Sequence, residues 1–244
     1  MTSEKDATPL LKKRIERRQA LTAMGGAGIG LAFGCGADTG ASPSSTPSAA
    51  ANTTPTASTN ATCAVTPTET VGPYPSLSDI FRSDVRESRP GTVLTLTIKV
   101  VNASSSCAAA TNANVEIWQC DAAGNYSSYG SQTGQTYLRG IQTTNANGEV
   151  TFMTVYPGWY QGRASHIHAE VTIGGRSVKV TQIAFPESIN NTVHATGVYA
   201  SRGSNPTINL QDGIFADSLS AELVTPVGSP TGGYTVAFQI GIAA

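Results

Sequence analysis

Residues 163–173 have the sequence R-A-S-H-I-H-A-E-V-T-I, in which polar and apolar side chains alternate from His166 onward. In a β-strand successive side chains point to opposite faces. One face of this strand would carry the apolar residues Ile167, Ala169, Val171 and Ile173. The other face would carry His166, His168, Glu170 and Thr172. An uninterrupted apolar row on one face predicts a strand that packs against a hydrophobic core.

The same strand brings two imidazoles side by side. The chain has only three histidines in 244 residues, so His166 and His168 on one face indicate a metal site, because neutral imidazole is the commonest metal ligand. An exposed polar face is the alternative interpretation of this pair. A copper or zinc site would need a third and a fourth histidine or a carboxylate nearby, and only His194 is left. His194 has no motif around it and is interpreted as a loop histidine.

Short β-type runs, divided by clusters of Gly, Asn, Pro and Ser, continue from about Thr62 to the end of the chain. This pattern, without helical periodicity of useful length, predicts an all-β fold, an antiparallel β-sandwich with long loops. The expected strands are 93–101, 114–119, 149–155, 166–173, 177–185 and 234–240. Residues 186–230 are rich in loop signals, and one helical turn is expected at 188–191.

The first 35 residues form a separate segment. Basic residues at positions 12–18 precede a small, apolar, glycine-rich run that ends at Cys35, which predicts an export signal. The pair Arg17-Arg18 resembles a twin-arginine signal, and residues 31–35 resemble a bacterial lipobox, with conventional cleavage as the alternative to lipidation of Cys35. Residues 36–62 are almost wholly Ala, Ser, Thr, Pro, Asn and Gly, a composition that predicts a disordered, flexible linker. The protein is therefore expected outside the cytoplasm, with a membrane tether if Cys35 is lipidated.

Composition limits what the domain at residues 63–244 can do. With 39 % hydrophobic residues the chain can form a real core, and a formal net charge of -1 predicts no affinity for nucleic acid. In an oxidising compartment two of the three cysteines of this domain are expected to pair. Cys63 and Cys107 both lie in turn-rich sequence and are the favoured pair, whereas Cys120, at the end of an expected strand, is the expected free buried thiol.

Three further segments bear on whether the histidine pair belongs to a metal site. Residues 68–74 read T-E-T-V-G-P-Y, residues 115–126 read V-E-I-W-Q-C-D-A-A-G-N-Y, and residues 156–163 read Y-P-G-W-Y-Q-G-R and run directly into the histidine strand. In this order, together with L-R-G at 138–140 and T-Q at 181–182, they resemble the intradiol ring-cleavage dioxygenases. The resemblance covers about half of the chain, and the combined motif is highly specific.

The resemblance implies a mononuclear ferric ion held by two tyrosinates and two histidines. The matching residues are Tyr126, Tyr160, His166 and His168. Ferric iron is a hard ion that favours anionic oxygen donors, and a bound cation lowers the pKa of a phenol. Two phenolates and a hydroxide would balance the charge of the ion while both imidazoles stay neutral. The tyrosines expected in pocket or packing roles are Tyr74, Tyr129 and Tyr156.

The resemblance also implies three catalytic residues. The arginine matching Arg163 stabilises negative charge on the substrate ring, the glutamine matching Gln182 lines the same pocket, and the tyrosinate matching Tyr160 accepts a substrate proton. The implied substrates are O2 and a small aromatic diol of the catechol type, opened between its two hydroxylated carbons to a muconate-type dicarboxylate. A surface arginine is the alternative for Arg163, and a hydrogen-bonding residue on a strand face is the alternative for Gln182. Trp118 is expected to pack near the site.

The chain departs from the well-studied members of that family. Ala164-Ser165 stands where Pro-Ala is usual, the spacing from Tyr160 to Arg163 is shortened, and the helical dimerisation domain of catechol 1,2-dioxygenases has no counterpart in the sequence. These differences are typical of a small exported bacterial branch with a more open pocket. The alternative function is a non-catalytic binding sandwich at the cell surface, of the transthyretin-like or carboxypeptidase-regulatory-like type.

Overall fold

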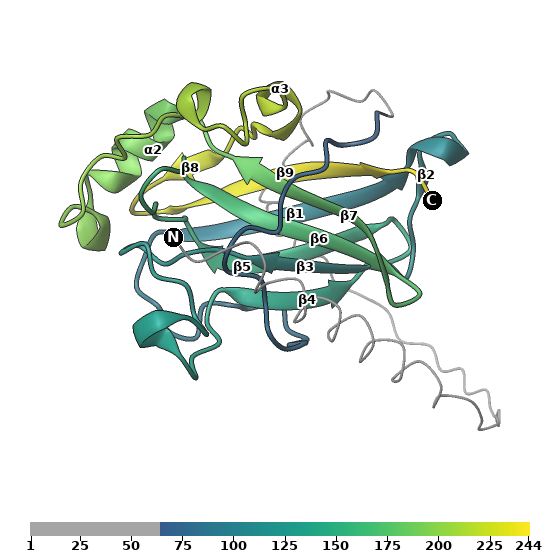
Figure 1. The fold of residues 1–244 in the computed structure, drawn as a ribbon, viewed down its shortest axis with the longest axis horizontal. Helices are drawn as coiled ribbons and strands as arrows, with labels where there is room; N and C mark the ends of the chain where they lie inside the picture. The colour runs from purple at the N-terminus through teal and green to yellow at the C-terminus, as the bar shows by residue number, and fades with distance from the viewer. Residues whose placement is uncertain (1–63) are drawn as a thin grey trace, which may run out of the picture.

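The structure, a computed structural model, describes residues 64–244 of the chain (Figure 1). The expected export signal at 1–35, including Cys35, and the expected linker at 36–62 lie outside these residues. Within the described range no helix is both long enough and apolar enough to cross a membrane.

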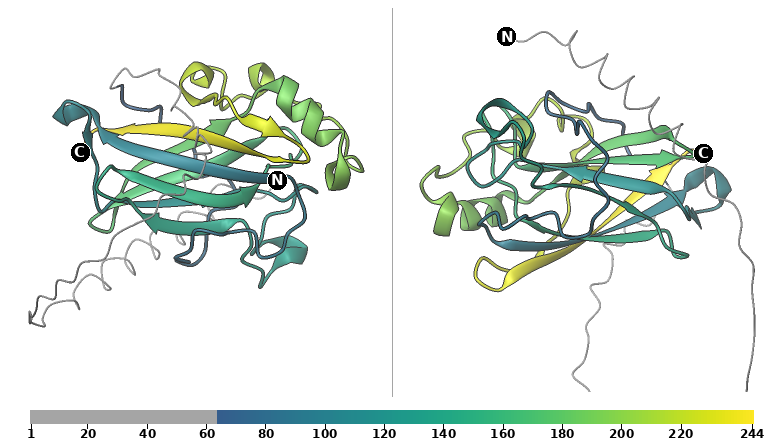
Figure 2. Two further views of the ribbon diagram at one scale, coloured as in Figure 1. Left: turned by 180° about the vertical axis from the view of Figure 1, so that it is seen from behind. Right: turned by 90° about the horizontal axis from the view of Figure 1, so that it is seen from below.

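Two sheets lie over one another as two layers (Figure 2). The five-stranded sheet has the order β2-β1-β9-β8, with β5 also paired to β1, and the four-stranded sheet has the order β4-β3-β6-β7. The strands are β1 (Val93–Asn102), β2 (Ala108–Ala109), β3 (Asn114–Trp118), β4 (Arg139–Thr143), β5 (Glu149–Val155), β6 (His166–Ile173), β7 (Arg176–Ala184), β8 (Val227–Ser229) and β9 (Gly233–Ile242). The predicted all-β sandwich is confirmed.

The sheets depart from the expected antiparallel pairing at one place, because β1 and β9 run parallel. These are the first and last strands of the described sandwich, so no tight turn joins them and dictates an antiparallel direction. The sequence pattern missed β2, β4 and β8. β2 and β8 have two and three residues, too few for alternation to appear, and β4 begins with a buried arginine followed by glycine.

The helical elements are short, and four of the six follow β7; α2 and α3 both lie along one edge of the sandwich (Figure 1). They are η1 (Ala103–Ser105), η2 (Gly130–Gln132), α2 (Glu187–His194), η3 (Gly197–Tyr199), η4 (Asn209–Gln211) and α3 (Leu219–Glu222). The helical turn expected at 188–191 is therefore part of a longer helix. The interpretation of His194 as a loop histidine is wrong, because His194 is the last residue of α2 and is buried.

The core lies between the two sheets and confirms the alternation on β6. Its apolar row packs into the main hydrophobic cluster together with residues of β1, β3, β5 and β9. Members of that cluster include Leu94, Leu96, Ile98, Ile117, Phe152, Ile167, Ala169, Val171, Val236 and Ile240. Burying this apolar surface, at about 25 cal/mol per Å², is the main stabilising contribution to the fold.

The opposite face of β6 is buried as well, because chain segments cover the outer side of the four-stranded sheet. The segment at residues 66–74 crosses that face. Lys179 Nζ donates to the carbonyl of Thr66 at 2.6 Å, Glu69 N donates to the carbonyl of Val180 at 2.9 Å, and Gln182 Nε2 donates to the carbonyl of Thr70 at 3.0 Å. The histidine face of the strand is therefore covered by chain and does not face solvent.

The structure confirms one of the two predictions made for the cysteines. Cys120 is free and buried, as predicted. Cys107 is disulfide-bonded, and its partner lies outside the described residues. The pairing of Cys107 with Cys63 stays a prediction.

Candidate metal centre

His166 and His168 project from the same face of β6 and are 2 % and 1 % exposed. Their Nε2 atoms lie 3.1 Å apart. The Nδ1 atom of His166 lies 2.6 Å from the carbonyl oxygen of Ala164, which can only accept a hydrogen bond, so Nδ1 carries the proton and Nε2 keeps its lone pair. The backbone next to the strand thus selects the tautomer that leaves Nε2 free for a ligand role.

Both imidazoles are held neutral. Burial, followed by the charge of Arg163, lowers the pKa of His166 to about 3. Burial, followed by His166, lowers the pKa of His168 well below its usual value. Neutral imidazole is the form that coordinates a metal.

Tyr126 and Tyr160 approach the histidines from two different loops. Tyr126 lies in the loop after β3 and Tyr160 in the loop before β6, with their ring centroids 5.6 Å apart. The Tyr160 ring lies 5.7 Å from the His166 ring, and the Tyr126 ring lies 6.4 Å from the His168 ring. Burial raises the pKa of both phenols, so in the protein alone they are protonated at neutral pH.

These four side chains fit a cation that prefers nitrogen and phenolate donors. The Tyr126 hydroxyl is buried without any hydrogen-bond partner, an arrangement that a bound cation would satisfy. Such a cation would also reverse the effect of burial on the phenol pKa. Within residues 64–244 no group of three or more His, Cys, Asp or Glu side chains could hold a metal, so the copper or zinc alternative lacks the donors that it needs.

Two neighbours fix the position of the His168 ring. The Trp118 indole stacks on it, with ring centroids 4.8 Å apart and an angle of 2° between the planes, as expected for a packing residue near the site. On another side lies Gly72, with a φ of +68°, and a Cβ atom there would be 3.1 Å from His168 Cε1. The T-E-T-V-G-P-Y segment therefore owes its glycine to a left-handed backbone and a close approach to the imidazole.

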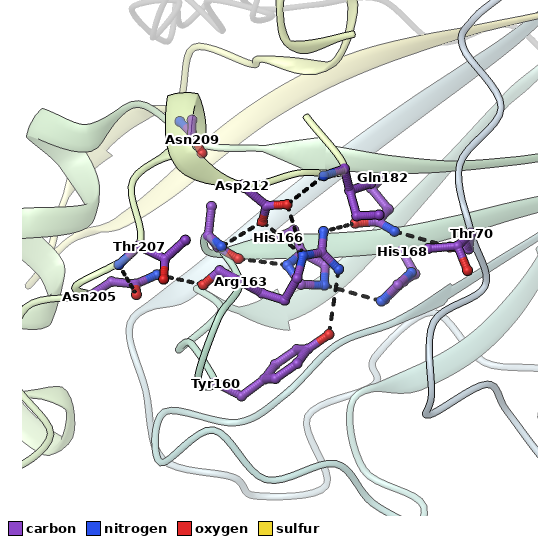
Figure 3. A network of polar contacts seen from close by, with 12 residues as sticks. Thr70, Tyr160, Arg163, His166, His168, Gln182, Asn205, Thr207, Asn209 and Asp212 are labelled. Atoms are coloured by element: carbon purple, nitrogen blue, oxygen red, sulfur yellow. Dashed lines mark hydrogen bonds and ion pairs between the residues drawn. The ribbon is translucent and has the colours of Figure 1, made fainter. Parts of the chain in front are cut away.

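Arg163 and Gln182 lie together beside the histidines (Figure 3). Arg163 Nη2 donates to Gln182 Oε1 at 2.6 Å, and Arg163 Nη1 lies 3.5 Å from the Tyr160 hydroxyl. The Nε–H group of Arg163 faces Asp212, with 2.8 Å to Oδ2. The fold thus brings together all six residues that the sequence assigned to the site, and it adds Asp212, for which the sequence offered no signal.

Tyrosines with other roles lie as the sequence predicted. Tyr74 stacks on Tyr126 with ring centroids 4.7 Å apart, and Tyr129 donates to the carbonyl of Pro75 at 2.7 Å. Tyr156 packs in the main core, where its hydroxyl donates to Asn190 at 2.8 Å. Pocket and packing roles account for these three side chains.

Arg139 is a buried residue that sequence reasoning left without a role, although it is the arginine of the L-R-G motif. Its Nη2 and Nε atoms donate to the carbonyl and hydroxyl of Ser127 at 2.7 and 2.8 Å, and Nη1 donates to the carbonyl of Tyr74 at 3.0 Å. Burial lowers its pKa to about 10, so it stays charged at neutral pH. One guanidinium thus ties the loop that carries Tyr126 to the segment that carries Gly72.

Comparison with known proteins agrees with this geometry. A family model described as "Dioxygenase" matches residues 74–202. An intradiol ring-cleavage dioxygenase from Tetranychus urticae superposes with a TM-score of 0.70 at 30% identity, over 74% of this chain and 95% of that chain. The dioxygenase domain of a dioxygenase carbohydrate-binding protein fusion from Streptomyces sp. SirexAA-E superposes with a TM-score of 0.55 at 28% identity, over 72% and 97%.

Hydroxyquinol 1,2-dioxygenase from Pseudomonas putida DLL-E4 shares the fold at 15% identity, with a TM-score of 0.56 over 74% of this chain and 67% of that chain. No curated protein sequence matches the chain. Fold and site together define a β-sandwich oxidoreductase with paired histidines on one sheet face and two tyrosines on neighbouring loops. The chain belongs to the intradiol ring-cleavage dioxygenases, a family that uses non-haem iron.

Proposed function

We propose that this protein is an Fe(III)-dependent dioxygenase that opens catechol-type aromatics between the two hydroxylated carbons and releases muconate-type dicarboxylates. The observation that carries the proposal is the convergence of Tyr126, Tyr160, His166 and His168 from three separate segments onto one buried point. The Nε2 lone pairs of the histidines and the phenol oxygens are the donors that would hold ferric iron. When bound, the ion would supply a Lewis acid to the two oxygens of the diol, which makes the diol ring reactive toward O2.

Tyr160 is suited to proton transfer. It is only half-buried, whereas Tyr126 is 4 % exposed, so Tyr160 is the phenol that can move and meet a substrate. Burial raises the pKa of this phenol, and the nearby charge of Arg163 opposes part of that rise. A Tyr160 oxygen that loses its proton on ion binding would accept one proton of the diol.

Arg163 would stabilise the negative charge that develops on the ring during the reaction. Its guanidinium is part-buried, where a fixed charge acts more strongly than in water. Gln182 accepts from Nη2 and is itself held through the carbonyl of Thr70, which keeps the guanidinium beside the histidines. The Arg163 side chain therefore need not reorganise when negative charge develops on the substrate ring.

The proposal is tested on the full chain loaded with ferric iron. We expect a visible tyrosinate-to-iron absorption band, a shift of this band to longer wavelength when catechol is added without oxygen, and uptake of one O2 per muconate formed when oxygen is admitted. A Tyr126→Phe, Tyr160→Phe double variant is expected to lack the band. A colourless protein with stoichiometric ferric iron bound would contradict the proposal, and unchanged ligand binding by the double variant would favour the non-catalytic binding sandwich.

We also propose that the protein is exported and held at the cell surface or in the periplasm through Cys35. Support comes from the signal-like residues 1–35 and from the disulfide at Cys107, a bond typical of oxidising compartments. Intact-mass analysis of the membrane fraction is expected to show a lipidated cysteine. A Cys35→Ser variant should appear in the soluble exported fraction, and a wild-type chain found there without lipid would contradict the tether.

A further inference from the structure

Asp212 is completely buried, with 0 % exposure, in the loop that follows η4. It lies outside residues 74–202, the part of the chain that the family model matches. A buried carboxylate is costly unless charged or polar donors surround it. The donors around Asp212 therefore indicate what it does.

Three N–H groups point at this carboxylate (Figure 3). Arg163 Nε lies 3.0 and 2.8 Å from Oδ1 and Oδ2. The backbone N–H of Ala164 donates to Oδ2 at 2.7 Å, and that of Ile214 donates to Oδ1 at 2.9 Å. Asp212 is thus bonded both to the side chain of Arg163 and to the peptide that follows it.

The ion pair restricts where the guanidinium can point. Its Nε edge is occupied by Asp212 and its Nη2 group by Gln182, which leaves Nη1 directed toward the Tyr160 hydroxyl. A free arginine side chain would retain its rotamer entropy, which would have to be lost at each encounter with substrate. Here that freedom is removed in the folded protein.

Other residues of the same loop support the arrangement. Asn205 Nδ2 donates to the carbonyl of Arg163 at 2.9 Å, and the Phe215 ring lies 5.8 Å from the guanidinium carbon. The loop therefore holds the backbone, the Nε edge and one side of the guanidinium of Arg163, all from residues between 205 and 215. Such support from several sides is what a fixed electrostatic group requires.

Asp212 also reaches His166 through the chain. It accepts from the N–H of Ala164, and the carbonyl of the same residue accepts from His166 Nδ1 at 2.6 Å. Fixing Ala164 thus fixes the bond that selects the His166 tautomer. Groups that hydrogen-bond to a metal-binding side chain, without touching the metal themselves, set the orientation of that side chain.

We propose that Asp212 is a positioning residue, which directs the guanidinium of Arg163 toward the reacting diol and orients His166 through the Ala164 peptide. The part that concerns the diol rests on the proposed function. The part that concerns Arg163 and Ala164 holds for the protein without metal or substrate.

The first test is nitrogen-15 NMR on the full metal-free chain, with the Arg163 Nε–H signal assigned by its loss in Arg163→Lys. We expect slow solvent exchange in the wild type and exchange faster by at least about tenfold in Asp212→Asn, because the ion pair is lost. Asp217→Asn is the matched control, since Asp217 is an exposed acid of the same loop, and its Arg163 signal should be that of the wild type. An Arg163 Nε–H that exchanges rapidly in the wild type would overturn the proposal, even if Asp212→Asn fails to fold.

The second test uses the iron-loaded chain and catechol. We expect Asp212→Asn to keep the tyrosinate band and to lose about 10- to 100-fold in kcat, with a smaller change in KM, as is usual for residues that orient a catalytic group. In an Arg163→Gln background the same substitution should cost clearly less in kcat, no more than about threefold, because only its effect on His166 through the Ala164 peptide is left. Equal losses in both backgrounds would overturn the proposal. An inactive wild type would count against the proposed function alone, since the NMR result would still decide the role of Asp212.

Discussion

The Nε2 atoms of His166 and His168 lie 3.1 Å apart because the two residues share one face of β6. Neither ring can turn away, since Trp118 stacks on one and the carbonyl of Ala164 holds the other. The two nitrogen donors of the proposed site are thus fixed in the protein without metal. The chemistry of the site depends on which oxygen donors the loops bring to this pair.

Tyr126 and Tyr156 allow a direct comparison of a ligand with a packing residue. Tyr126→Phe is expected to leave the stability of the metal-free protein unchanged or higher, because the lost hydroxyl is buried without a partner, while iron affinity falls. Tyr156→Phe removes a hydrogen bond to Asn190 and should cost about 1 kcal/mol with iron affinity unchanged. Thermal unfolding and iron titration measure both quantities, and the same pattern in both variants would contradict the assignment of Tyr126.

Two features are expected to require a glycine at position 72: the left-handed backbone and the close approach of the His168 ring. Gly72→Ala should lower stability by about 1–2 kcal/mol through the left-handed backbone and should also weaken iron binding, because its Cβ would lie 3.1 Å from His168 Cε1. Gly134→Ala is the control, since its φ is +85° and nothing lies within 4 Å of the added atom. If both variants bind iron like the wild type, the contact with His168 has no role in the site.

Arg139 should be irreplaceable even by lysine. A single ammonium cannot bond Ser127 and Tyr74 together as the guanidinium does, so Arg139→Lys is expected to lower the free energy of unfolding by about 3 kcal/mol. Urea denaturation measures this value. Arg176→Lys on the exposed surface of β7 should stay within about 0.5 kcal/mol of the wild type. A similar small effect at Arg139 would show that the two segments are held by other contacts.

His194 makes stability depend on pH. Burial lowers its pKa below the usual 6.5, so as pH falls through 6.5 the unfolded chain takes up a proton before the folded one does. The stabilising contribution is therefore present above this pH and lost below it. We expect the wild type to lose more stability than His194→Gln between pH 7.5 and 5. The other two histidines are common to both chains, so parallel curves would exclude a depressed pKa at His194.

Cys120 is expected to be chemically silent in the folded protein. Burial raises its pKa to about 12, and only the thiolate reacts with iodoacetamide. Labelling at pH 8 should appear only as the chain unfolds, and non-reduced peptide mapping should find Cys107 joined to Cys63. Rapid labelling of Cys120 in the native protein, or a mixed disulfide that includes it, would contradict these expectations.

Local patterns were enough for much of the fold. Alternation predicted β5 and β6 with their observed bounds and β1, β3, β7 and β9 to within two residues at either end. It missed short strands, the parallel pair β1 and β9, and the length of α2, because these depend on which segments meet after the chain has folded. The buried state of His194 was missed for the same reason.

By itself, the sequence determined the sandwich through alternation and the family through its combined motifs. The resemblance to that family is also what named His166, His168, the two tyrosines, Arg163 and Gln182 as expected site residues. The tertiary structure alone decided that Asp212 directs Arg163 from 49 residues away and that Arg139 holds Tyr74 from 65 residues away. Contacts between such distant residues depend on the path of the intervening loops, which no local periodicity encodes. Short motifs therefore name the groups of the site, and long-range packing sets their direction, their protonation and their neighbours.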